Sequence, residues 1–501
     1  MASSVRTSLN VGFAAALLVT SIDCIAKADD IVARPPASGR SDLTTGYGAF
    51  RHLQALQEIA TASGGNRAAG TVGYDRSAQY VADRLKEAGY AVRFEEFEFP
   101  FFEEKSPPIL LLSKPDGSQE PASGNAVRTL ASSGSREVEA HLHAVNLQLS
   151  DGSPGASVSG CERNDFDGFV RGAVALVRRG TCQFQVKVDN AVAAGAAGVI
   201  IMNEGTDGRT DAFSGVLSKG ADVPVVGVSY EFGRSLAGRT GDSVRLAVNA
   251  VTGKRVTRNV LADMGANMGV DDKSALIVAG AHLDSVTEGP GINDNGSGSA
   301  AVLEAALRLA QEPAQNRGRM RFAFWGAEER GLVGSRHHVS SLSDDERRRI
   351  AVYVNLDMVG SPNFTRFVRA SVAKLEGLAA IAREEVVTEF RTHDLPFEER
   401  TGSGSGSDDA SFSQKGIPTV GLYTGASGRK PESEAKASGG VAGRPYDPCY
   451  HRACDTVENI NREVLEQHTR ALVRALRAAA NAARTPSASV PEAIDLPGAK
   501  Q

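Results

Sequence analysis

The chain has 501 residues, of which 41% are hydrophobic, and it carries a formal net charge of -5. This length exceeds what one compact domain normally holds, so the sequence predicts two domains with buried cores. Lysine and arginine are scattered along the chain and do not gather into a basic stretch. Such a distribution argues against nucleic acid and other polyanions as partners.

The first 28 residues have the three-part pattern of a cleaved secretory signal. Arg6 precedes an apolar run from Val11 to Ile22, and the small-residue segment 26–28 offers a cleavage site. The run is too short to span a bilayer, and no later segment approaches the ~20 apolar residues that a membrane helix requires. We therefore expect residues 1–28 to be removed and the mature protein to be secreted or periplasmic, without a membrane anchor.

Cysteine usage fits an oxidising compartment. Of the five cysteines, Cys24 is lost with the signal, which leaves Cys161, Cys182, Cys449 and Cys454, an even number. These allow three pairings, and closeness in sequence favours Cys161 with Cys182 and Cys449 with Cys454. A zinc site built from all of them is the competing hypothesis, but the chain lacks the C-x-x-C knuckle that is typical of such sites.

The first part of the mature chain is predicted to be helical. Between residues 47–90 the apolar residues recur at helical spacing on both sides of a glycine-rich loop, which predicts two helices. Residues 91–99 then alternate apolar and charged side chains like a half-buried strand, and we expect Pro100 to end it. Residues 110–250 contain short strands separated by glycine, serine and aspartate, with one helix near 186–195.

The chain beyond Asn259 alternates strands, loops and helices. Short apolar runs there predict buried parallel strands of an α/β sheet with helices on both faces. A long amphipathic helix is expected from Val464 to Ala483, and the tail 485–501 is expected to be disordered. The apolar runs span Ala275–Ala279, Met320–Phe324, Val352–Leu356 and Pro418–Leu422.

Polar side chains that can bind a metal ion follow three of these runs. His282 and Asp284 follow the first run, Glu328 and Glu329 follow the second, and Asp357 follows the third. Open α/β sheets bind ligands at the carboxyl ends of their strands, so we expect these side chains to meet at one edge. Imidazole nitrogen and carboxylate oxygen are the ligands of a catalytic zinc, which keeps a position open for water.

Two further residues extend this candidate metal site. Asp294 lies in the glycine-rich turn 291–296 and can bridge two metal ions, since a carboxylate has two oxygens to share. His451 would complete the second metal site. Asp284 is placed in sequence to orient the imidazole of His282 as an outer partner.

The adjacent glutamates are expected to have separate roles, because successive side chains point in different directions. Glu329 can bind metal while Glu328 faces the metal-bound water and accepts its proton. Zinc lowers the pKa of such a water to about 7, which makes hydroxide available as a nucleophile at neutral pH. Hydrolysis of peptides is the natural use of such a site.

Each of these residues alone has a simpler explanation. A lone histidine such as His282 is more often structural than a ligand. Glu328 and Glu329 alone would be charges at a helix entry, and Asp294 alone would be a turn residue. The ordered set favours the metal hypothesis over these explanations. The adjacent histidines at 337 and 338 diverge on a helix and are expected to lie on the surface.

Five blocks of the sequence, in order, resemble the secreted co-catalytic di-zinc aminopeptidases of the bacterial leucyl aminopeptidase kind. Together with the N-terminal helices, the resemblance covers nearly all of the chain outside the signal, an inserted segment and the tail. The blocks are AHLDSVTEGPGINDNGSGSA (Ala281–Ala300), FAFWGAEERGLVGS (Phe322–Ser335), NLDMVG (Asn355–Gly360), GSDDASFSQKGIPTVGLYTG (Gly406–Gly425) and DPCYHRACDT (Asp447–Thr456).

The inserted segment has a resemblance of its own. GAVALVRRGTCQF, from Gly172 to Phe184, followed by AGAAGVIIMN, is similar to the protease-associated (PA) domain, a non-catalytic β-rich module. The two resemblances imply a zinc peptidase domain of residues 40–108 and 252–484 with the PA domain inserted at 109–251. The implied fold is α/β, with a mixed, mostly parallel sheet sandwiched by helices.

The resemblance implies two zinc ions per chain and removal of an amino-terminal residue from peptides, usually a large apolar one such as leucine. Peptides with a free amino terminus are the expected partners, and the chain is expected to be a monomer. The implied roles are one zinc on His282 and Asp357, a second on Glu329 and His451, Asp294 as their bridge, Glu328 as general base, Tyr450 as the hydroxyl that steadies the tetrahedral oxyanion, and a Cys449–Cys454 disulfide that frames this loop.

Substrate anchoring leaves alternatives open. The resemblance implies that Glu328 and Asp357 hold the amino terminus of the substrate. Some relatives have an arginine where this chain has Gly406, and Arg400 is a nearby candidate to replace it. A carboxypeptidase of the same fold would need a basic cluster facing the cleft, which residues 402–409 do not supply. A catalytically silent binding protein would be expected to have lost metal ligands, and all of them are present.

Overall fold

The computed structural model describes residues 48–113, 117–122, 126–149, 157–206, 209–264, 275–313, 317–372, 374–402 and 406–484. The expected signal at 1–28 and the expected disordered tail at 485–501 lie outside these residues. Within them, no helix combines the length and the apolar character that crossing a membrane requires.

Two amphipathic helices open the described chain, as the sequence predicts. α1 spans Gly48–Thr61 and α2 spans Val72–Glu87, and each buries one apolar stripe in the main core. Thr71 caps α2, because its side chain accepts a hydrogen bond from the backbone N–H of Tyr74. Gly89, with a φ of 92°, turns the chain away just after the helix, a left-handed conformation that glycine adopts without strain.

A long antiparallel ribbon follows these helices. β1 spans Ala91–Ser113 and pairs along most of its length with β8, Ser243–Asp263. The expectation that Pro100 ends the first strand is wrong, since Pro100 lies opposite Lys254 within the ladder. Among the described strands, only β8 pairs with β1 at this point, so β1 is an edge strand here, the position in a sheet where a proline is tolerated.

Six further strands join β8 in the main sheet: β9 (Leu276–His282), β10 (Met320–Trp325), β11 (Ile350–Leu356), β12 (Arg366–Ala370), β13 (Phe397–Thr401) and β14 (Thr419–Tyr423). Their order is β13-β12-β14-β11-β9-β10-β8. The pairs β13–β12, β14–β11, β11–β9 and β9–β10 are parallel, whereas β12–β14 and β10–β8 are antiparallel. The mixed, mostly parallel sheet of the expected fold class is therefore confirmed.

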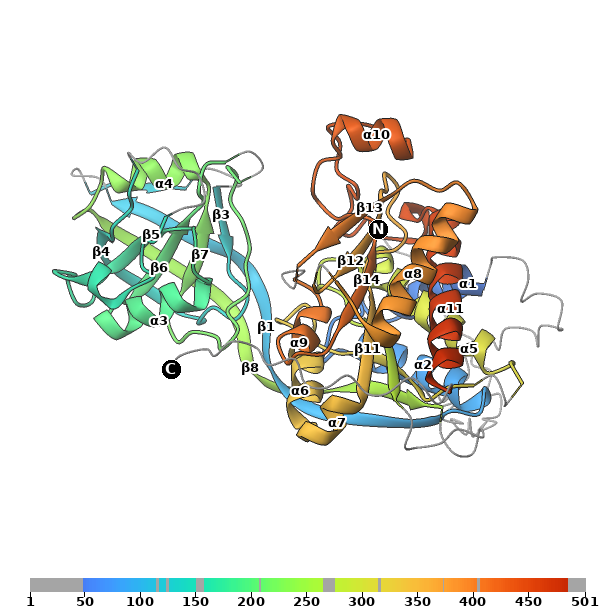
Figure 1. Ribbon diagram of the computed structural model, residues 1–501. Helices are drawn as coiled ribbons and strands as arrows, with labels where there is room; N and C mark the ends of the chain where they lie inside the picture. The colour runs from blue at the N-terminus through green and yellow to red at the C-terminus, as the bar shows by residue number, and fades with distance from the viewer. Residues whose placement is uncertain are drawn as a thin grey trace, which may run out of the picture. The chain divides into compact units, whose positions relative to one another are not determined.

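Helices cover both faces of the main sheet, because alternate strand residues point to opposite sides. Ile277, Ala279 and Ala281 of β9 belong to one apolar core, whereas Leu276 and Val278 belong to the other. The first core is closed by α1, α2, α5 (Gly298–Leu309), α8 (Gly377–Thr392) and α11 (Arg462–Ala483). The second core is closed by α6 (Val333–Ser341) and α9 (Asp409–Ser413). Figure 1 shows α5, α8 and α11 together on one side of the strands. The short helices α7 (Asp344–Arg349) and α10 (Glu432–Ser438) complete this part of the chain.

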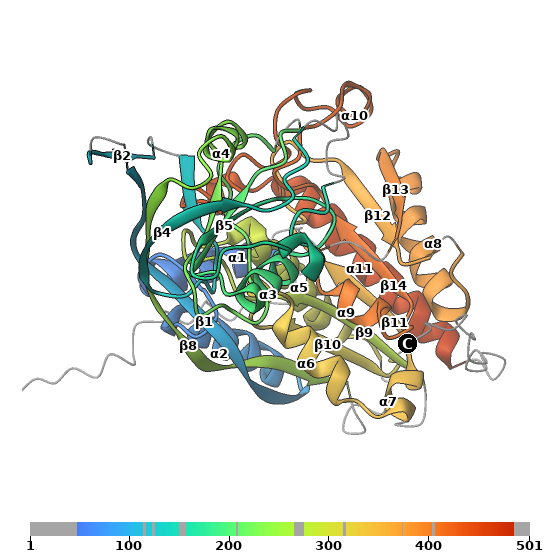
Figure 2. The same ribbon diagram turned by 90° about the vertical axis from the view of Figure 1, so that its left-hand side faces the viewer.

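The segment of the sequence between β1 and β8 forms a smaller, inserted sheet. It consists of β4 (Glu137–Ala144), β5 (Val174–Arg178), β6 (Gly198–Met202), β7 (Val225–Val228) and β3 (Val127–Thr129), in that order, while β2 (Gln119–Pro121) pairs with β1. The predicted helix near 186–195 is α3 (Phe184–Ala194), and α4 (Tyr230–Ala237) is a second one that the sequence pattern did not reveal. These two helices contribute to separate cores on either face of the inserted sheet. Figure 2 labels α3 and α4 together with β4 and β5 of this sheet.

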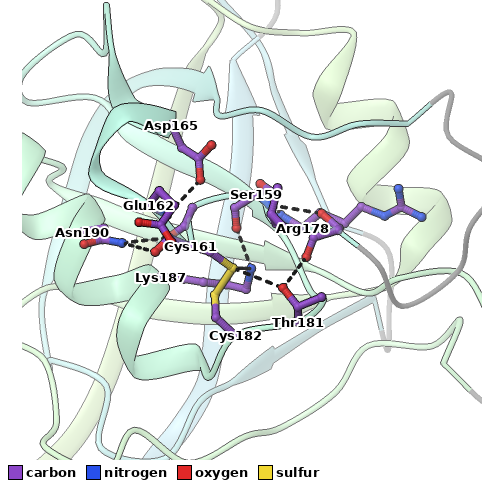
Figure 3. The surroundings of a disulfide bond; sticks show 12 residues. Ser159, Cys161, Glu162, Asp165, Arg178, Thr181, Cys182, Lys187 and Asn190 are labelled. Carbon is purple, nitrogen blue, oxygen red and sulfur yellow. Dashed lines mark hydrogen bonds between the residues drawn. A yellow bond between two sulfur atoms is a disulfide. The ribbon is translucent and has the colours of Figure 1, made fainter. Parts of the chain in front are cut away.

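A disulfide joins Cys161 to Cys182, next to the start of α3. Figure 3 shows the Lys187 ammonium buried beside it, with Nζ 2.5 Å from the carbonyl oxygen of Ser159 and 3.5 Å from the sulfur of Cys161. Asn190 Nδ2 donates to the Cys161 carbonyl at 2.9 Å. Burial lowers the pKa of Lys187 to about 8, so the charge of this buried group is only weakly compensated.

The adjacent histidines 337 and 338 separate between surface and core. His337 is exposed, and its ring stacks on Phe97 at 5.3 Å. His338 is buried, with Nδ1 3.0 Å from a carboxylate oxygen of Glu95. The expectation of a surface position is therefore wrong for His338, because β1 contacts α6 and supplies the carboxylate.

Candidate metal centre

The carboxyl ends of three neighbouring parallel strands bring the candidate ligands together. β9 ends at His282, β10 ends three residues before Glu328, and β11 ends just before Asp357. In the sheet register Trp325 of β10 lies opposite His282 of β9. The polar side chains that follow these strands therefore emerge at the same edge of the sheet.

Two groups of three side chains can each hold a metal ion, and they share one member. In the first group, His282 Nε2 lies 3.3 Å from Asp294 Oδ1 and 3.4 Å from Asp357 Oδ1. In the second, His451 Nε2 lies 3.0 Å from Asp294 Oδ2 and 3.2 Å from Glu329 Oε2. The two oxygens of Asp294 thus face different imidazoles, which is the arrangement that a bridging carboxylate needs.

The chemistry of this donor set fits divalent zinc. Oδ1 of Asp357 and Oε1 of Glu329 are buried without a hydrogen-bond partner, and an unpartnered buried carboxylate oxygen is costly unless a cation satisfies it. Burial alone would lower the pKa of His451, but the carboxylates of Glu329 and Asp294 outweigh this effect and raise the pKa to about 11. The cluster therefore attracts positive charge strongly, and metal ions compete with protons for the same atoms.

Glu328 lies beside these groups without belonging to either. Its Oε2 is 3.9 Å from His282 Nε2, and the residue is 9% exposed and lines the same cavity. Burial raises the pKa of Glu328 well above its ordinary range, and Glu329 and Asp357 raise it further against the lowering effect of His282. A carboxyl group in this setting can both take up and release a proton.

Left-handed backbone conformations adjoin the ligands. Ala327, just before the two glutamates, has a φ of 55°, Met358, just after Asp357, has a φ of 52°, and His451 itself has a φ of 57°. Such conformations are uncommon for residues with a Cβ and are retained where the surrounding structure enforces them. The surrounding structure thus holds the backbone in strained conformations that orient these side chains.

Asp284 lies beside His282 and also contacts the turn that carries both glutamates, a second contact that the sequence did not indicate. His282 Nδ1 lies 3.1 Å from the backbone oxygen of Asp284 and 3.7 Å from Oδ1 of the Asp284 carboxylate. The carboxylate instead accepts hydrogen bonds from the backbone N–H groups of Glu328 and Glu329, at 3.1 and 3.3 Å. Asp284 therefore holds the turn that carries both glutamates, and its main chain orients the imidazole.

Two buried aspartates, missed by the sequence analysis, hold the Asp294 turn. Asp455 accepts from the backbone N–H groups of Asn293 and Asp294, at 2.8 and 3.0 Å. Asp447 accepts from the side-chain amide of Asn293 at 2.6 Å and from that of Asn459 at 2.9 Å. Both lie near His451 in the chain, so this network joins the loop of His451 to the loop of Asp294.

Arg67 is a third positioning residue without a sequence signal. It is fully buried, and its guanidinium donates to the backbone carbonyls of Leu283, Pro290 and Gly291. These carbonyls flank the loop between His282 and the Asp294 turn. A buried arginine with main-chain partners cannot be told from a surface arginine by its local sequence.

Tyr450 lies against the second group of ligands. Its ring stacks on the imidazole of His451, with 3.8 Å between the ring centroids. Burial raises the pKa of Tyr450 well above its ordinary range, and Asp294 and Glu329 raise it further, so the hydroxyl keeps its proton. The loop is closed by a disulfide between Cys449 and Cys454.

A cavity of ≈ 470 Å³ opens over the cluster. Apolar and aromatic side chains form part of its wall, among them Met358, Leu422 and Tyr423. Arg336 and Arg369 also line it, and both lie outside residues 402–409, the segment in which the sequence shows no basic cluster. Neither arginine forms an ion pair with any residue that the structure describes.

Arg400, the candidate for substrate anchoring, does not line this cavity. Its guanidinium pairs instead with Glu434 at 3.1 Å and lies over the ring of Phe367. Gly406 borders the cavity and contributes no side chain. The arginines at the cavity therefore come from α6 and β12, and not from residues 400–406.

Comparison with known proteins adds to this geometry. Residues 259–476 match Peptidase family M28, and residues 145–236 match the PA domain. An aminopeptidase of Pseudomonas aeruginosa is 41% identical over 433 residues, which cover 84% of this chain and 78% of that protein.

Solved structures of aminopeptidases share the fold. An aminopeptidase from Aneurinibacillus sp. strain AM-1 superposes with a TM-score of 0.69 at 26% identity, covering 90% of this chain and 97% of that one. A zinc aminopeptidase from Bacillus subtilis superposes with a TM-score of 0.63 at 26% identity, covering 89% and 99%.

Proposed function

Because the chain belongs to peptidase family M28 and carries a PA domain, we propose that it is a zinc aminopeptidase that removes the first residue of peptides with two metal ions. The observation that carries the proposal is the pair of three-ligand groups sharing Asp294. His282, Asp294 and Asp357 would hold one zinc, and Asp294, Glu329 and His451 the other. Bound there, zinc supplies a Lewis acid and lowers the pKa of a coordinated water toward 7.

The proton transfers fall to Glu328. Its carboxylate accepts a proton from the attacking water and later delivers one to the nitrogen of the leaving amine. Its position beside His282 in the wall of the cavity, together with its burial, supports this role. The hydroxyl of Tyr450 donates to the oxygen of the scissile carbonyl as negative charge develops there.

Selection of the amino terminus follows from charge. Glu328 and Asp357 border the cavity, and in its ionised form each carboxylate can bind a free ammonium group, which a blocked amino terminus lacks. The apolar wall formed by Met358, Leu422 and Tyr423 supports a large apolar first residue such as leucine. Binding of the free amino terminus by these carboxylates is the reason for proposing an exopeptidase and not an endopeptidase.

The destination of the protein is proposed from its N-terminus and its disulfides. Residues 1–28 have the composition of a cleaved secretory signal. The bonds Cys161–Cys182 and Cys449–Cys454 are of the kind that persists in oxidising compartments. Both features support a secreted or periplasmic protein.

The proposal is tested by hydrolysis of leucine anilide and of its amino-blocked counterpart. We expect cleavage of the free-amine substrate alone, loss of activity with a chelator, and recovery with zinc at two ions per chain. Glu328→Gln should lower kcat by about 100-fold or more while zinc content stays at two, since the variant removes the base and not a ligand. Glu98→Gln, an exposed residue paired with Lys254, is the matched control and should be as active as the parent.

A carboxypeptidase remains the second candidate, since Arg336 and Arg369 line the cavity and could hold a terminal carboxylate. Release of the last residue from amino-blocked peptides, with no cleavage of leucine anilide, would favour it over the aminopeptidase.

A further inference from the structure

Arg369 is the cationic residue most closely built into the cavity wall. It lies on β12, directly opposite Gly421 of β14 in the antiparallel register. A Cβ placed on Gly421 would lie 3.4 Å from the Cβ of Arg369 and 4.0 Å from its Cδ. The stem of the arginine therefore packs against the bare backbone of Gly421, in space that a larger side chain would fill.

An aromatic ring helps to hold the guanidinium. The guanidinium carbon of Arg369 lies 5.4 Å from the centroid of the Tyr423 ring, within cation–π range. Tyr423 lines the cavity as well. The side chain is half-buried, in contrast to Arg336, which is exposed on α6.

Within the part of the chain that the structure describes, Arg369 has no ion-pair or hydrogen-bond partner. Its nearest counterparts are paired: Arg400, beside it on β13, bonds Glu434 at 3.1 Å, and Arg366, earlier on β12, bonds Gln467 at 2.8 Å. A partly desolvated guanidinium without an anion is unfavourable and gains from any carboxylate that reaches it. The cavity is the side from which such a group can come.

We propose that Arg369 binds a carboxylate of the peptide substrate and so sets part of the specificity of this enzyme, an inference that rests on the proposed aminopeptidase function. A guanidinium presents two parallel N–H donors to one carboxylate, which gives both energy and orientation. Two carboxylates of a short peptide can reach the cavity: an acidic side chain on the first residue, and the terminal carboxylate of a dipeptide. Both carboxylates would bind Arg369 in the same way, so matched substrates are needed to distinguish the two sources.

The experiment measures kcat/KM for two matched substrate pairs. Glutamate anilide against leucine anilide reports a carboxylate on the first side chain, and Leu-Leu against Leu-Leu amide reports the terminal carboxylate. In Arg369→Met, one of the two ratios should fall by about 10- to 100-fold, the loss expected for a charge-assisted hydrogen bond. The ratio that falls identifies the source of the carboxylate.

Arg400→Met is the matched control, because it removes a neighbouring guanidinium that Glu434 already neutralises, and it should change neither ratio. Arg369→Lys keeps the charge and loses the paired donors, so the affected ratio should fall less than in Arg369→Met. If Arg369→Met does not fold, Arg369→Lys decides alone by the same ratio.

Unchanged ratios in folded Arg369 variants would overturn the inference and leave the proposed aminopeptidase function in place. A parent enzyme that cleaves only the substrates without a carboxylate would have the same two consequences. A zinc-loaded parent that cleaves none of the four substrates would instead refute the proposed function, and the inference with it.

Discussion

Removal of the Asp455 carboxylate should weaken zinc binding although Asp455 is not a proposed ligand. Asp455 is buried, and its two oxygens accept the backbone N–H groups of Asn293 and Asp294 at 2.8 and 3.0 Å. In Asp455→Ala both donors lose their partner, and each unsatisfied buried donor costs about 1–3 kcal/mol. Part of that energy holds Asp294 between the two imidazoles. We therefore expect zinc affinity to fall by about 10- to 100-fold, the range typical for residues that position a metal ligand.

The assay is a competition titration of zinc against a chelating dye, with stoichiometry measured on the same sample. Asp455→Asn keeps one acceptor oxygen and should lose about tenfold in affinity, between the parent and the alanine variant. Asp263→Asn is the control, since Asp263 pairs with Arg321 near the opposite end of β10 and should bind zinc like the parent. A folded Asp455→Ala protein with parental affinity for both ions would refute the reasoning that these hydrogen bonds position Asp294.

Three further predictions concern stability. His468 is fully buried, and burial lowers its pKa to about 4. Between pH 6.5 and 4 the unfolded chain therefore binds a proton at His468 that the folded chain does not bind, so the free energy of unfolding should fall by roughly 3 kcal/mol from above pH 6.5 to pH 4. Denaturant titrations of the parent and of His468→Leu test this, because the variant should lack this loss. Burial lowers the pKa of Lys187 to about 8, so between pH 8 and 10.5 the unfolded chain binds more protons than the folded chain. The free energy of unfolding of the parent, relative to that of Lys187→Met, should therefore rise with pH across that window and stay constant below it. A Cβ on Gly298 would lie 2.4 Å from the carbonyl oxygen of Leu356, so Gly298→Ala should lower the free energy of unfolding by about 1–3 kcal/mol, whereas Gly253→Ala, with open space around it, should lower it by much less.

Local sequence patterns were sufficient for four strands of the main sheet, β9, β10, β11 and β14, whereas β12 and β13 were not predicted. The apolar runs before His282 and Asp357 are buried strands, and each is followed by its polar residue at the expected edge. This works because a strand is detected from a few adjacent residues, and parallel neighbours in an α/β sheet share one carboxyl edge. The family resemblance and the PA domain, confirmed by the comparisons, were likewise readable from short blocks.

Partners that are distant in sequence were not readable. Nothing near Asp455 indicates that its carboxylate accepts the N–H of Asp294, which is 161 residues away. Similarly, His338 was expected on the surface and is buried because Glu95, 243 residues away, comes from a strand that packs on its helix. Pro100 continues a strand for a reason of the same kind, since only the position of β1 in the sheet decides whether its missing N–H matters.

The sequence by itself therefore determined the residue types of the candidate site, the order of its strands along the chain and the presence of an inserted domain. Only the tertiary structure decided how Asp294 divides its oxygens between His282 and His451, and that Arg369, not Arg400, faces the cavity. The physical reason is that hydrogen bonds and ion pairs depend on distances of a few ångströms between segments whose separation along the chain is unrelated to their separation in space.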